Sequence, residues 1–147
     1  MLTNTCKYGI RALIYIASKS ENNKNIIGIK KISEELNLPT PFLSKILHQL
    51  VKSKILGSLK GPHGGYYFIK HPDKVSLYDV VLIIDGNRFF DDCIIQNRTC
   101  RSADEEELLC PIHEEFSKIR ESITMLFKSR TIQDLVESAR KSGEVIL

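Results

Sequence analysis

The spacing of apolar residues changes from a helical to a strand period within residues 41–69. Up to residue 52 they recur at i, i+3, i+4 and i+7, the spacing of one buried helix face. These apolar residues are Phe42, Leu43, Ile46, Leu47, Leu50 and Val51. After Lys54 the period becomes two, so segments 55–59 and 66–69 are predicted to be strands joined by the glycine-rich turn 60–65. The pattern predicts a helix followed by a two-stranded hairpin.

Residues 38–41 mark where this helix begins. Proline has a preset φ and no N–H, so it suits the first turn of a helix and cannot continue an earlier one. We therefore expect Thr40 to be the N-cap and Pro41 the first helical residue. Residues 29–36 form a shorter amphipathic helix, and the two helices with the turn between them predict a helix-turn-helix. An ordinary helical hairpin is the alternative, and the basic, glycine-rich hairpin that follows favours a winged helix.

The flanking segments carry further helical patterns. Residues 5–18 form a long helix in which Cys6 belongs to the apolar ridge, so Cys6 is expected to be a small buried core residue. Ser76 is expected to cap a helix that ends near residues 85–86. Residues 88–110 are the least regular part of the chain, although residues 102–105 fit a capping box and allow a short helical insert.

The C-terminal part is predicted to hold two helices, the first starting at Pro111 and the second capped by Thr131. The apolar residues of the first are three, four and three positions apart, which is a heptad-like seam. The seam consists of Phe116, Ile119, Ile123 and Leu126. Such a helix either lies on its own domain or pairs with a second copy of the chain.

Length and charge limit the class of protein. A chain of 147 residues suits one domain with a modest core, extended by an arm. Residues 1–75 hold 12 Lys and Arg against 4 Asp and Glu, whereas residues 76–147 hold 9 against 14. The basic half contains the predicted helix-turn-helix and hairpin, so double-stranded DNA is the expected partner. No apolar run reaches ~18 residues and no secretion signal precedes the first helix, so we expect a cytoplasmic protein with no membrane partner.

Three of the four cysteines fall within 18 residues, in the least regular segment. They are Cys93, Cys100 and Cys110, and His113 follows three residues later. A disulfide is disfavoured in a reducing compartment, whereas thiolates and imidazole suit an iron–sulfur cluster or zinc. If Cys110 starts a helix, His113 projects from the same side one turn later. Three readings stay open here: an iron–sulfur cluster, a zinc site, and free thiols that react with oxidants or nitric oxide.

Residues 60–66, Lys-Gly-Pro-His-Gly-Gly-Tyr, resemble the Arg-Gly-Pro-Gly-Gly-Gly-Tyr wing of bacterial regulators of the Rrf-two family, also written Rrf2. The resemblance covers nearly the whole chain, from residues 2–8 to residues 131–135. Lys60 replaces arginine and His63 replaces glycine, so the contacts of the wing tip with a DNA groove are expected to differ in detail. The resemblance implies a mostly helical fold: a winged helix-turn-helix domain with a small β-hairpin wing, and a long C-terminal dimerisation helix.

The resemblance also implies a DNA-binding surface, made by the N-terminal end of the second helix of the motif and by the wing. Base edges are usually reached from that end of the recognition helix, and the wing is expected to contact the DNA backbone or minor groove. The residues expected to contact DNA are Thr40, Pro41, Ser44, Lys45, Lys60, Gly61, His63 and Gly64. Ser44 takes the place of a glutamate found in some relatives, so the preferred operator is expected to differ from theirs.

The irregular loop is implied to be a cluster site, because members of the family bind an iron–sulfur cluster through three cysteines there. In some members a histidine three residues after the third cysteine completes the set, which makes His113 the implied fourth ligand. Others use an acidic residue near the N-terminus, where this chain has Lys7. The implied group is a 2Fe-2S or 4Fe-4S cluster, with zinc as the weaker alternative. Six residues separate Cys93 from Cys100 and nine separate Cys100 from Cys110, which is longer than in the relatives.

These features together predict a homodimeric, sequence-specific transcription regulator, expected to be a repressor, that senses redox state, nitric oxide or iron–sulfur supply. We expect residues 1–86 to form the DNA-binding domain and residues 87–147 to form the sensor loop and dimerisation helix. The alternative is a cluster-free or zinc-binding regulator of the same family, controlled by thiol oxidation or a partner protein. An electron carrier would leave the basic wing unexplained. No arrangement of catalytic residues is visible, so neither an enzyme nor a small-molecule substrate is expected.

Overall fold

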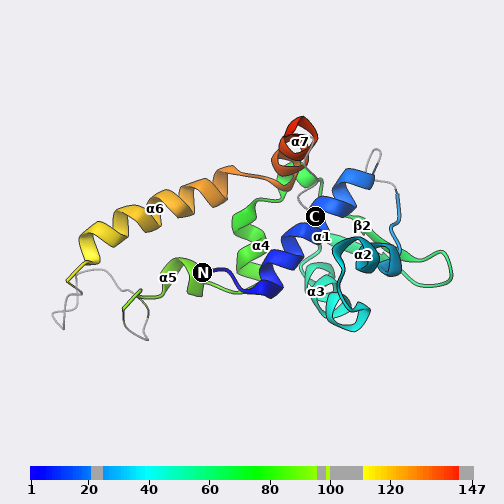
Figure 1. Cartoon of the computed structure of the whole chain (residues 1–147), viewed down its shortest axis with the longest axis horizontal. Helices are drawn as coiled ribbons and strands as arrows, with labels where there is room; N and C mark the ends of the chain where they lie inside the picture. Colours follow the sequence, from blue (N-terminus) through cyan, green and yellow to red (C-terminus); the bar gives the residue numbers. More distant parts are fainter. Residues whose placement is uncertain (21–24, 96–98, 100–110, 143–147) are drawn as a thin grey trace.

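The computed structural model describes residues 1–20, 25–95, 99 and 111–142. Its elements form a lobe from which one long helix, α6, extends as an arm (Figure 1). In chain order they are α1 Asn4–Lys19, α2 Ile29–Leu36, α3 Thr40–Lys52, β1 Leu56–Leu59, β2 Gly65–Phe68, η2 Pro72–Lys74, α4 Leu77–Ile84, α5 Arg88–Asp91, α6 His113–Ser129 and α7 Ile132–Ser142. We call the lobe formed by α1–α4, the β1–β2 hairpin and α7 the head.

The core of the head is built around α1, which contacts α2, α3, α4, β2 and α7. Seven apolar residues of α1 and its buried Gly9 explain this, because a helix that is apolar on most sides must be covered on most sides. The fully buried side chains that meet there include Leu13 and Ile16 of α1, Ile32 of α2, Leu47 of α3 and Ile132 of α7. The N-terminal end of α1 is capped by Thr3, whose hydroxyl accepts a hydrogen bond from the backbone N–H of Cys6 at 3.1 Å.

The predicted helix-turn-helix is confirmed as α2 and α3, joined by Asn37 in the left-handed conformation (φ 51°). The prediction that Thr40 is the N-cap of α3 is wrong by one residue. Pro39 is the N-cap, and its carbonyl accepts from the backbone N–H of Phe42 at 3.0 Å. The Thr40 hydroxyl instead donates to the Ser33 hydroxyl at 3.1 Å, so it joins α3 to α2.

The hairpin is antiparallel, with Leu56 opposite Phe68 and Leu59 opposite Gly65. Each strand lies within one residue of the predicted segment. Ile27 adds an edge to this small sheet, because its N–H and carbonyl exchange two 2.9 Å hydrogen bonds with Tyr66. The base of the hairpin is thereby tied to the segment that enters α2.

A second buried cluster lies where α1, α4 and α5 meet. It consists of Cys6, Val81 and Phe90, which are 0%, 0% and 4% exposed, so the prediction that Cys6 is a core residue is confirmed. Ser76 caps α4 as predicted, in a capping box with Asp79. The four-residue helix α5 was not predicted within the segment expected to be irregular, and the predicted insert at 102–105 lies outside the described residues.

Of the last two helices, α7 begins where it was predicted and α6 does not. α6 begins at His113 and not at Pro111, so the expectation that Cys110 starts this helix is wrong. Thr131 caps α7 as predicted: its hydroxyl accepts from the N–H of Asp134 at 3.1 Å. α7 then packs back on α1, with Ile132 fully buried. The division of the chain at residues 86 and 87 stays a prediction, although α7, from the predicted second part, packs on α1 of the first.

The observed class, mostly helical with one two-stranded hairpin in the described residues, is the predicted one. Within the described ranges, none of the helices is both long enough and apolar enough to cross a membrane.

Candidate DNA interface and sensor loop

The recognition helix α3 separates apolar from polar residues as its sequence predicts. Its buried residues are Leu43, Ile46, Leu47 and Leu50. Of the four predicted DNA contacts on α3, Pro41 and Lys45 are exposed, while Thr40 and Ser44 are half-buried. All four lie in the first two turns. This end of α3 therefore offers a hydroxyl at Ser44 and an ammonium group at Lys45 to a ligand that approaches from solvent.

The wing tip is exposed, as a DNA contact requires. Lys60, Gly61 and His63 are exposed and Gly64 is half-buried. The turn closes through a hydrogen bond from the Gly64 N–H to the Gly61 carbonyl at 2.9 Å. A side chain at Gly64 would overlap the carbonyl of Leu59. The close approach of the two backbone segments at the hairpin turn therefore requires glycine there.

The recognition helix and the wing are joined rigidly, because the N–H of Ile55 donates to the carbonyl of Leu50 at 3.2 Å. Ile55 and Leu50 are both buried. Neither Lys45 nor Lys60 forms an ion pair with another described residue. The arrangement can therefore attract a phosphate backbone.

The predicted sensor loop, residues 88–110, is described at residues 88–95 and 99, and the chain is described again from residue 111. Cys93 is half-exposed and follows α5 by two residues. Its neighbour Asp92 pairs with Thr99 in an isolated bridge, and the Asp92 carbonyl accepts from Nη2 of Arg120 on α6 at 3.3 Å. The predicted ligands Cys100 and Cys110 lie outside the described residues.

His113, the fourth predicted ligand, is the first residue of α6 and is half-buried. Its Nε2 lies 3.4 Å from the hydroxyl of Ser117, one turn along. Arg120 follows His113 by seven residues, so the two side chains lie on one side of α6, about two turns apart. Because Arg120 contacts the residue before Cys93, the loop and the first half of α6 are neighbours. Within the described part of the chain, no group of three metal-ligating side chains comes together.

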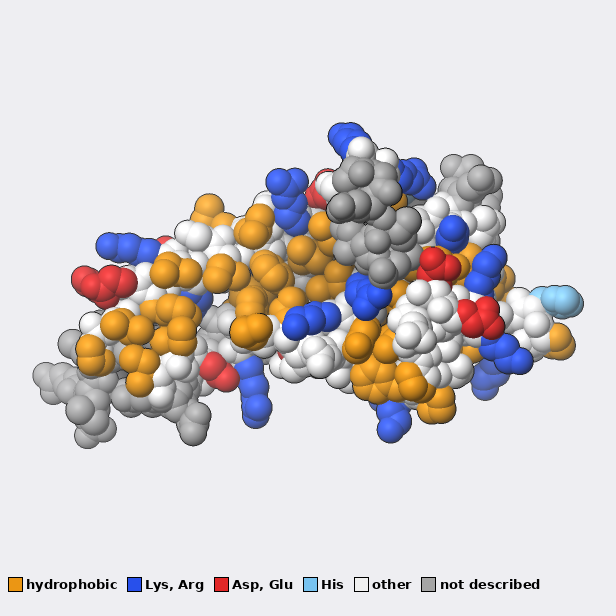
Figure 2. Space-filling model, in the orientation of Figure 1, with side chains coloured by type: hydrophobic (Ala, Val, Ile, Leu, Met, Phe, Trp, Pro, Cys, Tyr) orange, Lys and Arg blue, Asp and Glu red, His pale blue; other side chains and the backbone are white. Residues whose placement is uncertain are grey.

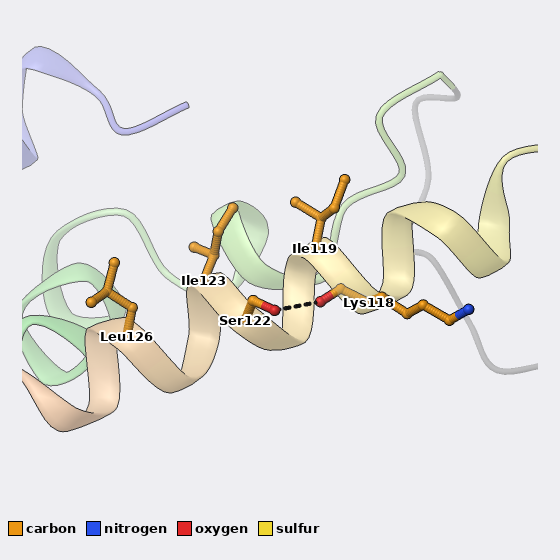
Figure 3. Close-up of a pocket in the computed structure, with 5 residues that line it drawn as sticks. All are labelled: Lys118, Ile119, Ser122, Ile123 and Leu126. Carbon is orange, nitrogen blue, oxygen red and sulfur yellow. Dashed lines mark hydrogen bonds between the residues drawn. The ribbon is translucent and has the colours of Figure 1, made fainter.

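The arm exposes its apolar seam. None of the residues of α6 is buried, and Ile119 and Leu126 are 53% and 51% exposed. Together with Ile123 they project to one side of the helix (Figure 3), where they line a shallow groove with Lys118 and Ser122. In the space-filling view, hydrophobic side chains gather along the arm and toward α4 (Figure 2).

Comparison with known proteins decides the family. The model of the Rrf2 family, described as an iron-dependent transcriptional regulator, matches residues 2–138. The chain belongs to the Rrf2 family. Its family resemblance is therefore confirmed, and Rrf2 membership makes it a DNA-binding transcription regulator and not an enzyme.

Relatives in the Rrf2 family match over most of their length. A protein of Aquifex aeolicus (strain VF5), whose name places it among HTH-type transcriptional regulators, is 28% identical over 96% of this chain and 94% of its own. NsrR of Shouchella clausii is 24% identical over 92% of this chain and 87% of its own. The structure of CymR, the global cysteine regulator of B. subtilis, covers 94% of this chain and 97% of its own with a TM-score of 0.75 at 22% identity. That similarity confirms the winged helix-turn-helix fold.

Sequence reasoning missed two groups of residues in this Rrf2 protein. Phe42 was assigned to the buried face of α3, but it is 37% exposed and meets the ring of Tyr8 edge-on, with centroids 6.0 Å apart. Phe89 and Phe90 were not singled out at all. Two adjacent aromatic residues in an otherwise polar segment were the available signal that part of it packs against the protein.

Proposed function

We propose that this Rrf2 protein is a homodimer that binds specific operator DNA through α3 and the wing, and that a cysteine-ligated iron–sulfur cluster controls its affinity for that DNA. The observation that carries the proposal is the exposure of the recognition helix and the wing tip together on the basic half of the chain. The proposed DNA contacts are the eight residues predicted above: Thr40, Pro41, Ser44, Lys45, Lys60, Gly61, His63 and Gly64.

Base contacts from α3 and backbone contacts from the wing have different signatures. Replacing Ser44 by Ala should change which base is preferred at one position of each half-site, because only base contacts carry sequence information. Replacing Lys45 should weaken binding to every sequence if its ammonium group contacts phosphate. Selection from a random duplex library, repeated with each variant, measures both effects. An unchanged preference for Ser44→Ala together with unchanged affinity for Lys45→Ala would contradict the assignment of α3 as the reading helix.

The proposed dimer forms through the exposed seam of α6. Apolar side chains that are half-exposed at spacings of three and four residues are typical of a helix that pairs with another helix. A symmetric pair also matches the two half-sites that helix-turn-helix proteins usually read.

Replacing Ile119 by Asp should give a folded monomer, because this side chain is 53% exposed in the single chain and its loss leaves the head intact. Glu121→Lys is the matched control, since residue 121 lies about 200° around the helix from residue 119. Sedimentation velocity measures whether each variant is a monomer or a dimer, and circular dichroism checks that both variants keep their helices. A dimer that survives Ile119→Asp would refute this interface.

The donor set of the loop fits the proposed cluster. Three thiolates with one imidazole suit an iron–sulfur cluster, and zinc accepts the same ligands. Cys93 and His113 stand on the two sides of the loop, and we assign Cys100 and Cys110 as the ligands between them. When bound, the cluster would supply a centre whose presence or oxidation state changes with redox state, nitric oxide or iron supply. Cys93 and His113 would then hold the loop against the end of α5 and the start of α6.

Anaerobic purification tests the cofactor directly. The expected protein is coloured and contains iron and sulfide, and Cys93→Ser should lose both while keeping the dimer. A 2Fe-2S and a 4Fe-4S cluster are distinguished by the ratio of iron to protein. A colourless protein with bound zinc, or with neither metal, would support the cluster-free alternative, in which thiol oxidation or a partner protein controls the regulator.

A further inference from the structure

Phe90 connects the sensor loop to the head. It precedes Cys93 by three residues and is 4% exposed. It belongs to one buried cluster with Cys6 in the first turn of α1 and Val81 of α4. A side chain on the short helix before the sensor cysteine is therefore packed inside the structure that carries the helix-turn-helix.

The same ring also contacts the arm. The centroid of Phe90 lies 5.8 Å from that of Phe127 on α6 and 4.6 Å from that of Tyr78 on α4. Phe89 adds a second contact with Phe127, at 5.4 Å. Nζ of Lys128 lies 4.7 Å from the centroid of Tyr78 and closes the group. Aromatic pairs at these separations attract one another beyond simple burial, so α5 is held to α4 and α6 by its two phenylalanines.

Among the described residues, the side chains that hold α5 to the rest of the protein are mainly these two phenylalanines. This helix is a single turn of four residues, and no side chain caps its N-terminus. The three residues from Phe90 to Cys93 span at most about 10 Å of extended chain. A backbone rearrangement at Cys93 is therefore expected to displace Phe90. The hydrogen bond from Arg120 to the Asp92 carbonyl also couples such a rearrangement to α6.

Within the head, the start of α1 is hydrogen-bonded to the end of α4. The N–H and the hydroxyl of Thr3 both donate to the carboxylate of Asp85 at the end of α4, at 2.9 and 2.5 Å. Cys6 follows in the first turn of α1, where its N–H donates to the Thr3 hydroxyl and its side chain belongs to the cluster with Phe90. Burial, with a smaller effect of the Asp85 charge, raises the pKa of the Cys6 thiol to about 12, so it stays a neutral packing group.

We infer that Phe90 is the positioning residue that transmits the state of Cys93 to the DNA-binding helices, through the buried cluster that it shares with Cys6 of α1 and Val81 of α4. This inference rests on the proposed function, because it needs a signal that arrives at Cys93. The recognition helix receives the change because α1 packs directly on α2 and α3.

The test compares the full-length wild-type protein with Phe90→Leu, which keeps an apolar side chain in the buried cluster but loses the ring contacts with Tyr78 and Phe127. The affinity for operator DNA is measured with the cluster loaded anaerobically and again after its removal. Coupling between two sites is typically about 5–150-fold, and this is the ratio expected for the wild type. Phe90→Leu should reduce the ratio to within about threefold of unity while the cluster-free affinity stays near the wild-type value.

Val136→Ala is the matched control for stability. Val136 is 2% exposed on α7, in the main core and outside the second buried cluster. It should lower the melting temperature to a similar extent and leave the affinity ratio unchanged. Hydrogen exchange at the amides of residues 6–10 gives a second readout: loading should change their protection in the wild type and in Val136→Ala, but not in Phe90→Leu.

The outcomes separate the two proposals. A wild type whose affinity and exchange do not respond to the cluster refutes the sensing function and the role of Phe90 with it. A wild type that responds, combined with a Phe90→Leu variant that responds equally despite a lower melting temperature, overturns the inference alone. If Phe90→Leu does not fold, Phe90→Met, whose unbranched and flexible side chain adapts more readily to the space left by the ring, is judged by the same two measurements.

Discussion

Removing the charge at the wing tip should change how DNA binding depends on salt. Lys60 is exposed at the tip and forms no ion pair within the described residues, so its full charge is available to phosphate. Lys60→Ala should weaken binding to specific and nonspecific DNA alike, because a phosphate contact carries no sequence information.

The size of the effect follows from counting phosphates. Each neutralised phosphate contributes about 0.9 to the slope of log K against log salt, and a dimer carries two wings. Lys60→Ala should therefore make the slope less negative by about 1.8. The ratio of the wild-type binding constant to that of Lys60→Ala should then increase about 12-fold when the salt is lowered from about 200 to about 50 mM. This factor is the fourfold dilution raised to the power of about 1.8.

Fluorescence anisotropy with a labelled operator duplex, titrated at several salt concentrations, measures this slope. Lys74→Ala is the matched control, because Lys74 is also exposed but lies on η2 beside α7, with its Nζ 3.9 Å from a carboxylate oxygen of Asp73. The control should leave the slope unchanged. An unchanged slope for Lys60→Ala, or a loss confined to the operator sequence, would refute the assignment of the wing as a backbone contact.

Three further predictions concern the stability of the head. Gly65→Ala should lower the free energy of unfolding by about 1–3 kcal/mol and weaken DNA binding, because the new Cβ would overlap the backbone of Ile27; urea unfolding and a gel shift measure the two effects. Ile132→Ala should cost about 2–5 kcal/mol, because this fully buried side chain fixes α7 to the head, and a loss below 1 kcal/mol in urea unfolding would contradict that packing. The backbone and then the side chain of Thr131 lower the pKa of Asp134 from its usual 3.8, so the stability it adds is fully present above pH 3.8 and is lost as the pH falls through the lowered value. Unfolding of Asp134→Asn should therefore depend less on pH than that of the wild type in this acidic range, and parallel curves would show that the hydrogen bonds of Asp134 add no stability.

Much of the candidate site could be predicted because it depends on local sequence. Alternating and helical periods are set by residues a few positions apart, and the glycines at 64 and 65 are required by a turn only six residues long. The sequence therefore placed the recognition helix, the wing and their exposed residues almost correctly. The N-cap of α3 was predicted one residue too late, at Thr40 and not at Pro39. The prediction assumed that the Thr40 hydroxyl would cap its own helix, but this hydroxyl finds its partner elsewhere. That partner is Ser33, on the preceding helix.

The sequence by itself determined most of the helices and both strands, where basic charge is concentrated, and that Cys6 belongs to the core. Only the tertiary structure decided that α5 exists, that α7 returns to α1, and that Phe90, three residues before Cys93, is buried with Cys6 and Val81. Each of these features depends on contacts between residues far apart in the chain. The physical reason is that a four-residue helix or an isolated terminal helix has too little hydrogen bonding of its own to be stable, so the burial of its side chains by distant elements determines whether and where it forms.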